Sequence, residues 1–347
     1  MSRYLQDILD QPDQLLQSLQ HSVDKGSGAL KKSAGLITGA KNVFITAIGA
    51  SWSAGIAIQA AFNEAGVQAV LCDAADFLYF TRIPPDSAVL FLSRSGKSVE
   101  LVQALPKCKL AKAAVISITN AADSPLAESS DACLLTSVRF DHSISVSTYS
   151  SIILTGLLLT QYFRPQSPGL LIYDELMESL REVNGRLKEW QDIIETTSWP
   201  EKNGHTYFTA RGASLASAHE SMLLWEEVAK QPAAALTTGA FRHGPQEIID
   251  NPLNMAVWLE NNIARDHDVK LINDLVGKKV NVLSIGQELP GRLKGHTVYV
   301  PSCPWLFSPV INIIPLQLAA EKLARMKGID PDVFLYCNFI VESEGGL

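Results

Sequence analysis

Cysteine is scarce in this sequence, and its spacing excludes the sites that cysteines usually build. The 347 residues include five cysteines, an odd number, and no two of them stand at C-x-x-C spacing. A disulfide framework and a zinc site both need paired or clustered cysteines. We therefore expect buried, unreactive thiols and no metal ion or other cofactor. The five are Cys72, Cys108, Cys133, Cys303 and Cys337.

The chain also lacks an excess of positive charge and a long hydrophobic run. Its formal net charge is -7, whereas a nucleic-acid surface needs a basic face, so we expect no nucleic-acid partner. Its most apolar run, Ile152–Leu159, contains Thr155 and Gly156 and is too short to span a bilayer. The N-terminal segment is too polar for a signal peptide. These absences predict a soluble cytoplasmic protein that has no membrane partner.

The apolar sequence that is present suffices for sizeable cores. Hydrophobic residues make up 47% of the chain and charged residues 19%, a balance that is ordinary for globular proteins. A chain of 347 residues exceeds one typical domain, so two domains are expected.

Short apolar runs alternate with helix-like segments through the first half of the chain. Val43–Ile48 has the pattern of a buried parallel strand and ends at Gly49. Strands that alternate with helices predict a doubly wound parallel α/β sheet. The predicted strands are 43–48, 67–71, 88–92, 114–118 and 132–135, and the predicted helices are 51–64, 98–110 and 147–162.

A second alternation follows a break at Arg164–Gly169 and a charged, helix-prone stretch at Tyr173–Thr196. The order of elements is similar in the two halves without a close sequence repeat, which indicates one fold used twice. The predicted strands are 206–210, 233–237, 255–259, 280–285 and 297–300, and the predicted helices are 214–230, 266–275 and 309–326. We predict an N-terminal helical segment at 1–30, a first, phosphate-binding domain at 31–165, a helical linker at 166–200, a second domain at 201–330 and a tail at 331–347.

Small hydroxyl residues gather where two strands of the first half end. One cluster is Gly49–Gly55, and the other is Ser93–Ser98. Ligands of open parallel sheets bind beyond the carboxyl ends of the strands. Serine hydroxyls and the free amides of a helix start make a phosphate site, which the helix dipole favours. The alternative is that these serines are only helix caps, but two such turns on one predicted sheet edge favour phosphate binding.

The two turns do not match other known ligand-binding or catalytic motifs, because each motif lacks a required glycine. Gly96-Lys97-Ser98 resembles the end of a Walker A loop, but Phe91 stands where that loop needs its first glycine. In the first turn, Ser51 replaces the second glycine of G-x-G-x-x-G, and Ser53 replaces the last glycine of G-x-S-x-G. A nucleotide triphosphatase, a dinucleotide-binding protein and an α/β-hydrolase are therefore disfavoured.

Taken in order, these motifs resemble the sugar isomerase (SIS) domain. GASWSAG at Gly49–Gly55 is followed by LSRSGKS at 92–98, ITNAADSPLAESSD at 118–131 and SVSTYSS at 145–151. The similarity is greatest to the isomerase domain of glucosamine-6-phosphate synthase and to related phosphosugar deaminases and isomerases. YLQDILDQP at 4–12 and Arg242–Pro245, which is KHGP in the family, extend the resemblance over nearly the whole chain.

The resemblance implies two flavodoxin-like SIS domains in tandem that bind a phosphorylated sugar or amino sugar, in a homodimer with shared active sites. It implies that Glu227 shuttles a proton between C1 and C2 without a metal, and that His243 of the neighbouring subunit helps to open the sugar ring. A partly desolvated carboxylate and a histidine suit these tasks. Without the resemblance, Glu226 and Glu227 are typical of a solvated helix face. The implied phosphate contacts are Ser51, Ser93, Arg94 through its backbone, Ser95, Ser98 and Ser147, and Ser53 of the first turn is a further candidate.

Departures from the synthase pattern bear on the reaction. Leu224 stands where the synthase has a lysine before its glutamate, and no lysine follows Lys327. No glutamine-hydrolysing domain precedes the sugar-binding half, so we expect no ammonia transfer from glutamine. A phosphosugar isomerase or a hexosamine-6-phosphate deaminase remains, and a deglycase of sugar-amine phosphates is a close variant. A non-catalytic phosphosugar-binding regulator is the alternative.

Overall fold

The computed structural model describes residues 1–163, 169–337 and 341, which form two compact units. The first unit consists of residues 13–177 together with the described residues after 333, and the second unit consists of residues 1–12 and 178–333. The division falls inside the two long helices α1 (Arg3–Asp24) and α8 (Gly169–Thr196). The predicted domain boundaries stay a prediction. Residues 164–168 of the predicted break and most of the predicted tail lie outside the described residues, and Gly169, the last residue of that break, begins α8.

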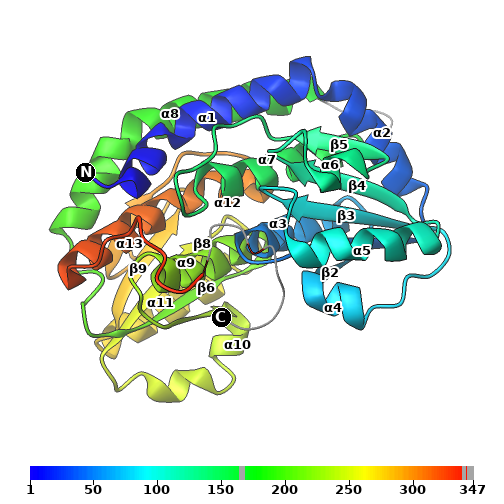
Figure 1. The fold of residues 1–347 in the computed structure, drawn as a ribbon. Helices are drawn as coiled ribbons and strands as arrows, with labels where there is room; N and C mark the ends of the chain where they lie inside the picture. The colour runs from blue at the N-terminus through cyan, green and yellow to red at the C-terminus, as the bar shows by residue number, and fades with distance from the viewer. Residues whose placement is uncertain (164–168, 338–340, 342–347) are drawn as a thin grey trace. The chain divides into compact units, whose positions relative to one another are not determined.

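The first unit contains a five-stranded parallel sheet in the order β2-β1-β3-β4-β5 (Figure 1). Strand β1 lies between β2 and β3, because Val43 pairs with Ala69 of β2 on one side and with Ala88 of β3 on the other. This is the flavodoxin-like strand order. The strands are β1 (Asn42–Ala47), β2 (Ala69–Asp73), β3 (Ser87–Ser93), β4 (Ala114–Thr119) and β5 (Ala132–Leu135).

Helices cover both faces of this sheet, as its buried strands require. On one face, α7 packs against α2 and α3, and every residue of α7 is buried. On the other face, α5 packs against α4 and α6. The helices are α2 (Ser27–Thr38), α3 (Ala50–Glu64), α4 (Ala74–Tyr79), α5 (Val99–Leu110), α6 (Pro125–Glu128) and α7 (Ser147–Thr160).

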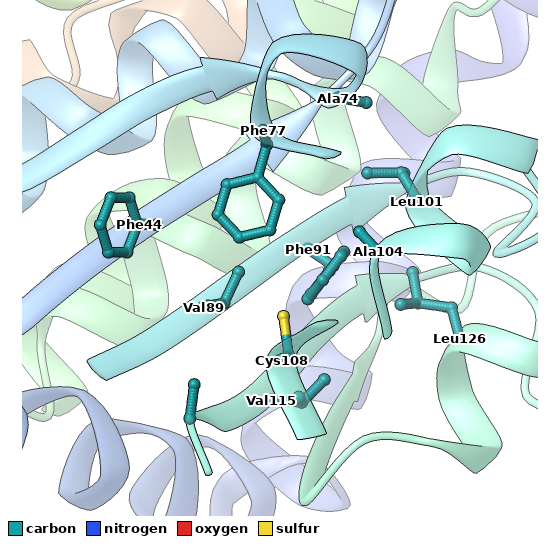
Figure 2. Close-up of a cluster of buried hydrophobic side chains, with 11 residues drawn as sticks. Phe44, Ala74, Phe77, Val89, Phe91, Leu101, Ala104, Cys108, Val115 and Leu126 are labelled. Atoms are coloured by element: carbon teal, nitrogen blue, oxygen red, sulfur yellow. The ribbon is translucent and has the colours of Figure 1, made fainter. Parts of the chain in front are cut away.

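The core beneath α4 and α5 is built from side chains of alternate strand positions. Figure 2 shows Phe44, Val89 and Phe91 of the sheet facing Phe77 of α4 and Cys108 of α5. The rings of Phe77 and Phe91 meet edge to face, with centroids 6.1 Å apart, a favoured geometry for buried aromatic pairs. This packing holds β3 and α5 in place and so positions the loop that joins them.

The second unit repeats the same strand order in a second parallel sheet, β10-β9-β8-β6-β7. Its first strand is again flanked by the second and third, because Thr206 pairs with both Ala233 of β7 and Asn254 of β8. The two sheets confirm the predicted α/β class and the predicted use of one fold twice. The strands are β6 (His205–Ala210), β7 (Ala233–Thr237), β8 (Leu253–Leu259), β9 (Asn281–Gly286) and β10 (His296–Tyr299).

The faces of this second sheet carry different aromatic clusters. On one face, Phe208 packs against Trp225 of α9 and against Trp258 of β8, and on the other face Tyr207 meets Phe241 of α10. Helices α12 and α13 pack against α9, and α11 packs against β8 and β9. The helices are α9 (Leu215–Glu227), α10 (Thr238–Phe241), α11 (Arg265–Gly277), α12 (Ser308–Asn312) and α13 (Ile314–Lys327).

All ten predicted strands are present, with ends that differ by a few residues. The predicted helix at 309–326 is instead two helices, α12 and α13. Helices α4, α6 and α10 were not expected and are too short to show a helical period, and α2 extends beyond the helical segment predicted at 1–30. Within the described part of the chain, none of the helices combines the length and hydropathy that a membrane crossing requires.

Candidate active site

Strands β1 and β3 are adjacent and parallel, so their carboxyl ends lie side by side at one end of the first sheet. The chain leaves β1 for α3 and leaves β3 for α5, and these helices pack on opposite faces. The loops that follow the two strands therefore diverge, which creates the crevice where open α/β sheets bind their ligands. Both serine-rich turns predicted to bind phosphate, Gly49–Gly55 and Ser93–Ser98, begin at this switch point.

The turn after β1 depends on a glycine. Gly49 has a φ of 58°, a left-handed conformation that costs glycine little, and it is the N-cap of α3 without a side-chain capping bond. Ser51 is half-buried in the first turn of the helix, where backbone amides lack partners within the helix. Ser53 is only 3% exposed and faces the interior. Of the two serines, Ser51 is therefore better placed to meet a ligand.

The loop after β3 is held by its own serines. Ser93 Oγ accepts a hydrogen bond from the Gly96 amide at 3.0 Å, and Ser95 Oγ accepts one from the Lys97 amide at 3.2 Å. Ser98 is the N-cap of α5, yet its side chain makes no capping hydrogen bond. The alternative that these serines are merely helix caps thus fails for Ser98, and it fails for Ser51, which lies inside α3.

Arg94 directs its side chain away from this loop. Its Nη1 atom donates to the backbone oxygen of Ser143 and to Ser145 Oγ, both at 3.1 Å. The guanidinium therefore holds the segment before α7, and only the Arg94 backbone belongs to the loop, as the resemblance implied.

Asp141 organises the start of α7 and was missed by the sequence reasoning. Its carboxylate accepts hydrogen bonds from the amides of Val146, Ser147 and Thr148 at 2.9–3.0 Å. Asp141 lies six residues before Ser147, outside the spacing of an ordinary N-cap, so the sequence held no signal for it. Because Asp141 takes the Ser147 amide, Ser147 could offer a ligand only its hydroxyl, and the residue is 2% exposed.

Glu227 is the last residue of α9 and is half-buried. Its backbone oxygen accepts a hydrogen bond from Lys230 Nζ, which also donates to the backbone oxygen of Val333 at 2.8 Å. The neighbouring Glu226 is exposed. Partial burial nevertheless raises the pKa of Glu226, and a backbone hydrogen bond from Ala233 opposes that rise.

His243 is exposed and lies two residues after the end of α10. Its amide donates to the backbone oxygen of Ala240 at 3.0 Å, and the 3-10 helix η2 (Pro245–Ile248) comes next. Helical turns therefore lie on both sides of His243. Helices α9 and α10 pack on opposite faces of the second sheet, because Trp225 of α9 contacts Phe208 and Phe241 of α10 contacts the neighbouring Tyr207.

The candidate residues divide between the units. All seven predicted phosphate ligands lie in the first unit, and both predicted catalytic residues lie in the second. Across the described residues, no group of three or more His, Cys, Asp and Glu side chains is arranged to hold a metal ion.

Residues 36–164, which include the whole first sheet, match the model of the SIS domain. This match confirms the predicted resemblance of the first sheet and its helices to a SIS domain. The chain is also 27% identical, over 346 residues and 94% of its length, to glutamine–fructose-6-phosphate aminotransferase (isomerizing) of Pseudomonas putida. It spans 56% of the length of that relative.

Solved structures share the fold over nearly the whole chain. The C-terminal domain of glucosamine-fructose-6-phosphate aminotransferase from Francisella tularensis superposes with a TM-score of 0.85 at 21% identity, covering 96% of this chain and 98% of that domain. Glucosamine-6-phosphate deaminase from Thermotoga maritima superposes with a TM-score of 0.81 at 19% identity, covering 98% and 99%. The architecture of two tandem SIS folds is thus shared with enzymes of phosphosugar chemistry.

Proposed function

We propose that this chain binds the phosphate of a sugar phosphate at the β1–β3 switch point and catalyses proton transfer between C1 and C2 of the open-chain sugar. The observation that carries the proposal is the meeting of two serine-rich turns at the carboxyl ends of adjacent strands. Ser51 and Ser98 are half-buried there, and neither side chain is used to cap its helix. The aminotransferase and deaminase similarities support the same class of substrate.

Glu227 is the proposed base. A carboxylate at a half-buried helix end can remove a proton from one carbon and return it to the next. His243 is proposed to act on the ring oxygen from a second copy of the chain. The packing of α9 and α10 on opposite faces of the sheet favours such an arrangement, in a homodimer whose sites are shared.

The reaction proposed is aldose–ketose isomerisation, with or without release of an amine. The fully buried Leu224 stands where the synthase has a lysine, so this position lacks the amino group that the synthase has there. A deaminase or a deglycase would use the same enolisation, followed by loss of ammonia or an amino acid.

A panel of sugar phosphates and their unphosphorylated counterparts tests the proposal. A ligand of the native state raises the melting temperature by mass action, so phosphorylated hexoses or hexosamines should stabilise the chain and the unphosphorylated sugars should not. Each stabilising compound is then assayed for isomerisation, ammonia release and amino-acid release. Stabilisation without turnover on any of them would favour the non-catalytic regulator, and no stabilisation at all would refute the phosphosugar site.

A further inference from the structure

The two units have equivalent switch points. In each, the first strand is six residues long and is followed two residues later by a Gly-Ala-Ser turn, Gly49–Ser51 or Gly212–Ser214. The two glycines have nearly the same positive φ angle, 58° and 59°. Ser214 of the second unit thus corresponds to Ser51, and the adjacent strand β8 corresponds to β3.

The crevice of the second unit contains a carboxylate of the protein itself. Glu260 follows β8 directly, as Arg94 follows β3, and it is 6% exposed. Its Oε1 atom accepts hydrogen bonds from Ser214 Oγ and from Asn312 Nδ2, the latter at 3.1 Å, and Oε2 accepts one from Ser308 Oγ at 3.1 Å. The three donor residues are each 0–1% exposed.

Side-chain amides donate hydrogen bonds to the two serine hydroxyls that contact Glu260. Asn312 Nδ2 donates to Ser214 Oγ at 2.8 Å, and Gln287 Nε2 donates to Ser308 Oγ at 3.0 Å. Each hydroxyl accepts one of these bonds and donates its own hydrogen to Glu260, and Cys303 Sγ lies 3.8 Å from Ser308 Oγ. An ionised carboxylate only accepts hydrogen bonds, so the network is ordered for an anion.

The cations nearby do not neutralise this carboxylate by direct contact. Arg211 directs its Nε atom to Asp268, at 2.9 and 3.1 Å. Arg265 donates to the backbone oxygens of Gln287 and Glu288. Burial raises the pKa of the Glu260 carboxyl, and the hydrogen bonds from Ser214, Ser308 and Asn312, together with the field of Arg265, oppose that rise. Neutral hydroxyl and amide donors thus surround the anion, the same donor types that the first crevice offers a phosphate.

We infer that Glu260 is a built-in anion that fills, in the second unit, the crevice proposed to bind phosphate in the first. Removing its side chain opens a binding site for a small oxyanion such as formate or phosphate. The parallel with the first unit rests on the proposed function, whereas the filled crevice of the second unit rests on the contacts of Glu260 alone.

Melting temperatures of Glu260→Gly in sodium formate and in sodium chloride of equal ionic strength test the inference. The variant leaves Ser214, Ser308 and Asn312 without their acceptor, so formate should raise its melting temperature by about 5 °C or more at a hundredfold excess over the dissociation constant. Wild type keeps its own carboxylate, and Glu260→Leu fills the space with carbon. Neither should respond to formate more than to chloride.

A double variant identifies the site. Adding Ser214→Ala to Glu260→Gly removes one donor and should abolish most of the formate response. A response of Glu260→Gly no larger than that of wild type or of Glu260→Leu would overturn the inference.

Wild-type calorimetry decides the question if Glu260→Gly does not fold in either salt. Inorganic phosphate titrated into the wild-type chain should find no site that depends on Ser214, and a site lost in Ser214→Ala would overturn the inference. These outcomes are separable from the proposed function. A wild-type chain that binds no sugar phosphate would refute that function, while a formate response of Glu260→Gly would still support the filled crevice.

Discussion

A Cβ atom added at Gly96 would lie only 2.1 Å from the Oγ atom of Ser124, so the β3–α5 loop passes too close to Ser124 for any side chain. Gly96 also has a φ of 64°, which penalises non-glycine residues. We expect Gly96→Ala to lower the free energy of unfolding by about 1–3 kcal/mol and to weaken phosphosugar binding.

Urea unfolding and binding isotherms measure both effects. Gly28→Ala is the matched control, because a Cβ at Gly28 in α2 meets nothing within 4 Å. A Gly96→Ala chain as stable as Gly28→Ala would contradict the prediction.

Asp141 should matter for stability because its buried carboxylate binds three amides at the start of α7. Asp141→Asn keeps the shape but turns an amino group toward those amides. We expect a loss of about 2 kcal/mol in the free energy of unfolding, as for other hydrogen bonds to a buried charge. Chemical denaturation measures it, with the exposed Asp123→Asn as control. Equal stability of the two variants would show that Asp141 is dispensable.

The first-turn serine should contribute to binding rather than to the chemical step. We expect Ser51→Ala to raise KM for the phosphosugar about tenfold, the value of one hydrogen bond to a charged group, with kcat little changed. Ser130→Ala is the control, because the Ser130 hydroxyl donates to Ser117 Oγ and to the Leu126 backbone oxygen and is not part of the proposed phosphate site. Steady-state kinetics distinguish them, and an unchanged KM in Ser51→Ala would remove Ser51 from the site.

Glu227 and its neighbour Glu226 form a natural pair of variants. Glu227→Gln should lower kcat by a factor of about 100–10,000, the usual contribution of a positioned base, while sugar phosphate binding persists. Glu226→Gln should leave kcat within a few-fold of wild type, because that side chain is exposed. Similar losses in both variants, measured with the best substrate of the panel, would argue against Glu227 as the base.

The thiols should differ sharply in reactivity. Burial raises the pKa of Cys108 to about 12 and also raises the pKa values of Cys72 and Cys133. The reactive form is the thiolate, and at pH 8 a pKa near 12 leaves about one Cys108 thiol in ten thousand ionised. A thiol reagent at pH 8 should therefore modify the exposed Cys337 first. Cys337→Ser should remove the fast phase, and its persistence would contradict this assignment.

The amino-acid sequence by itself determined the elements of the two sheets. Parallel strands covered by helices on both faces must be apolar along their whole length, so runs such as 43–48 and 88–92 were recognisable without tertiary information. The serine-rich turns were visible for the same reason, since each follows directly where such a run ends. The roles of Glu227 and His243 came from the family resemblance, because adjacent carboxylates on a helix otherwise look like a solvated face.

Only the tertiary structure decided which of these turns meet. Placing β1 beside β3 depends on packing α3 and α5 on opposite faces of the sheet, a long-range choice that no local pattern records. The roles of Asp141 and Glu260 were likewise visible only in the folded structure. Asp141 accepts hydrogen bonds from amides that lie further along the chain than those an ordinary N-cap residue contacts. The Glu260 partners Ser214, Ser308 and Asn312 are 46 to 52 residues away in the chain, and only the folded sheet brings them around one carboxylate.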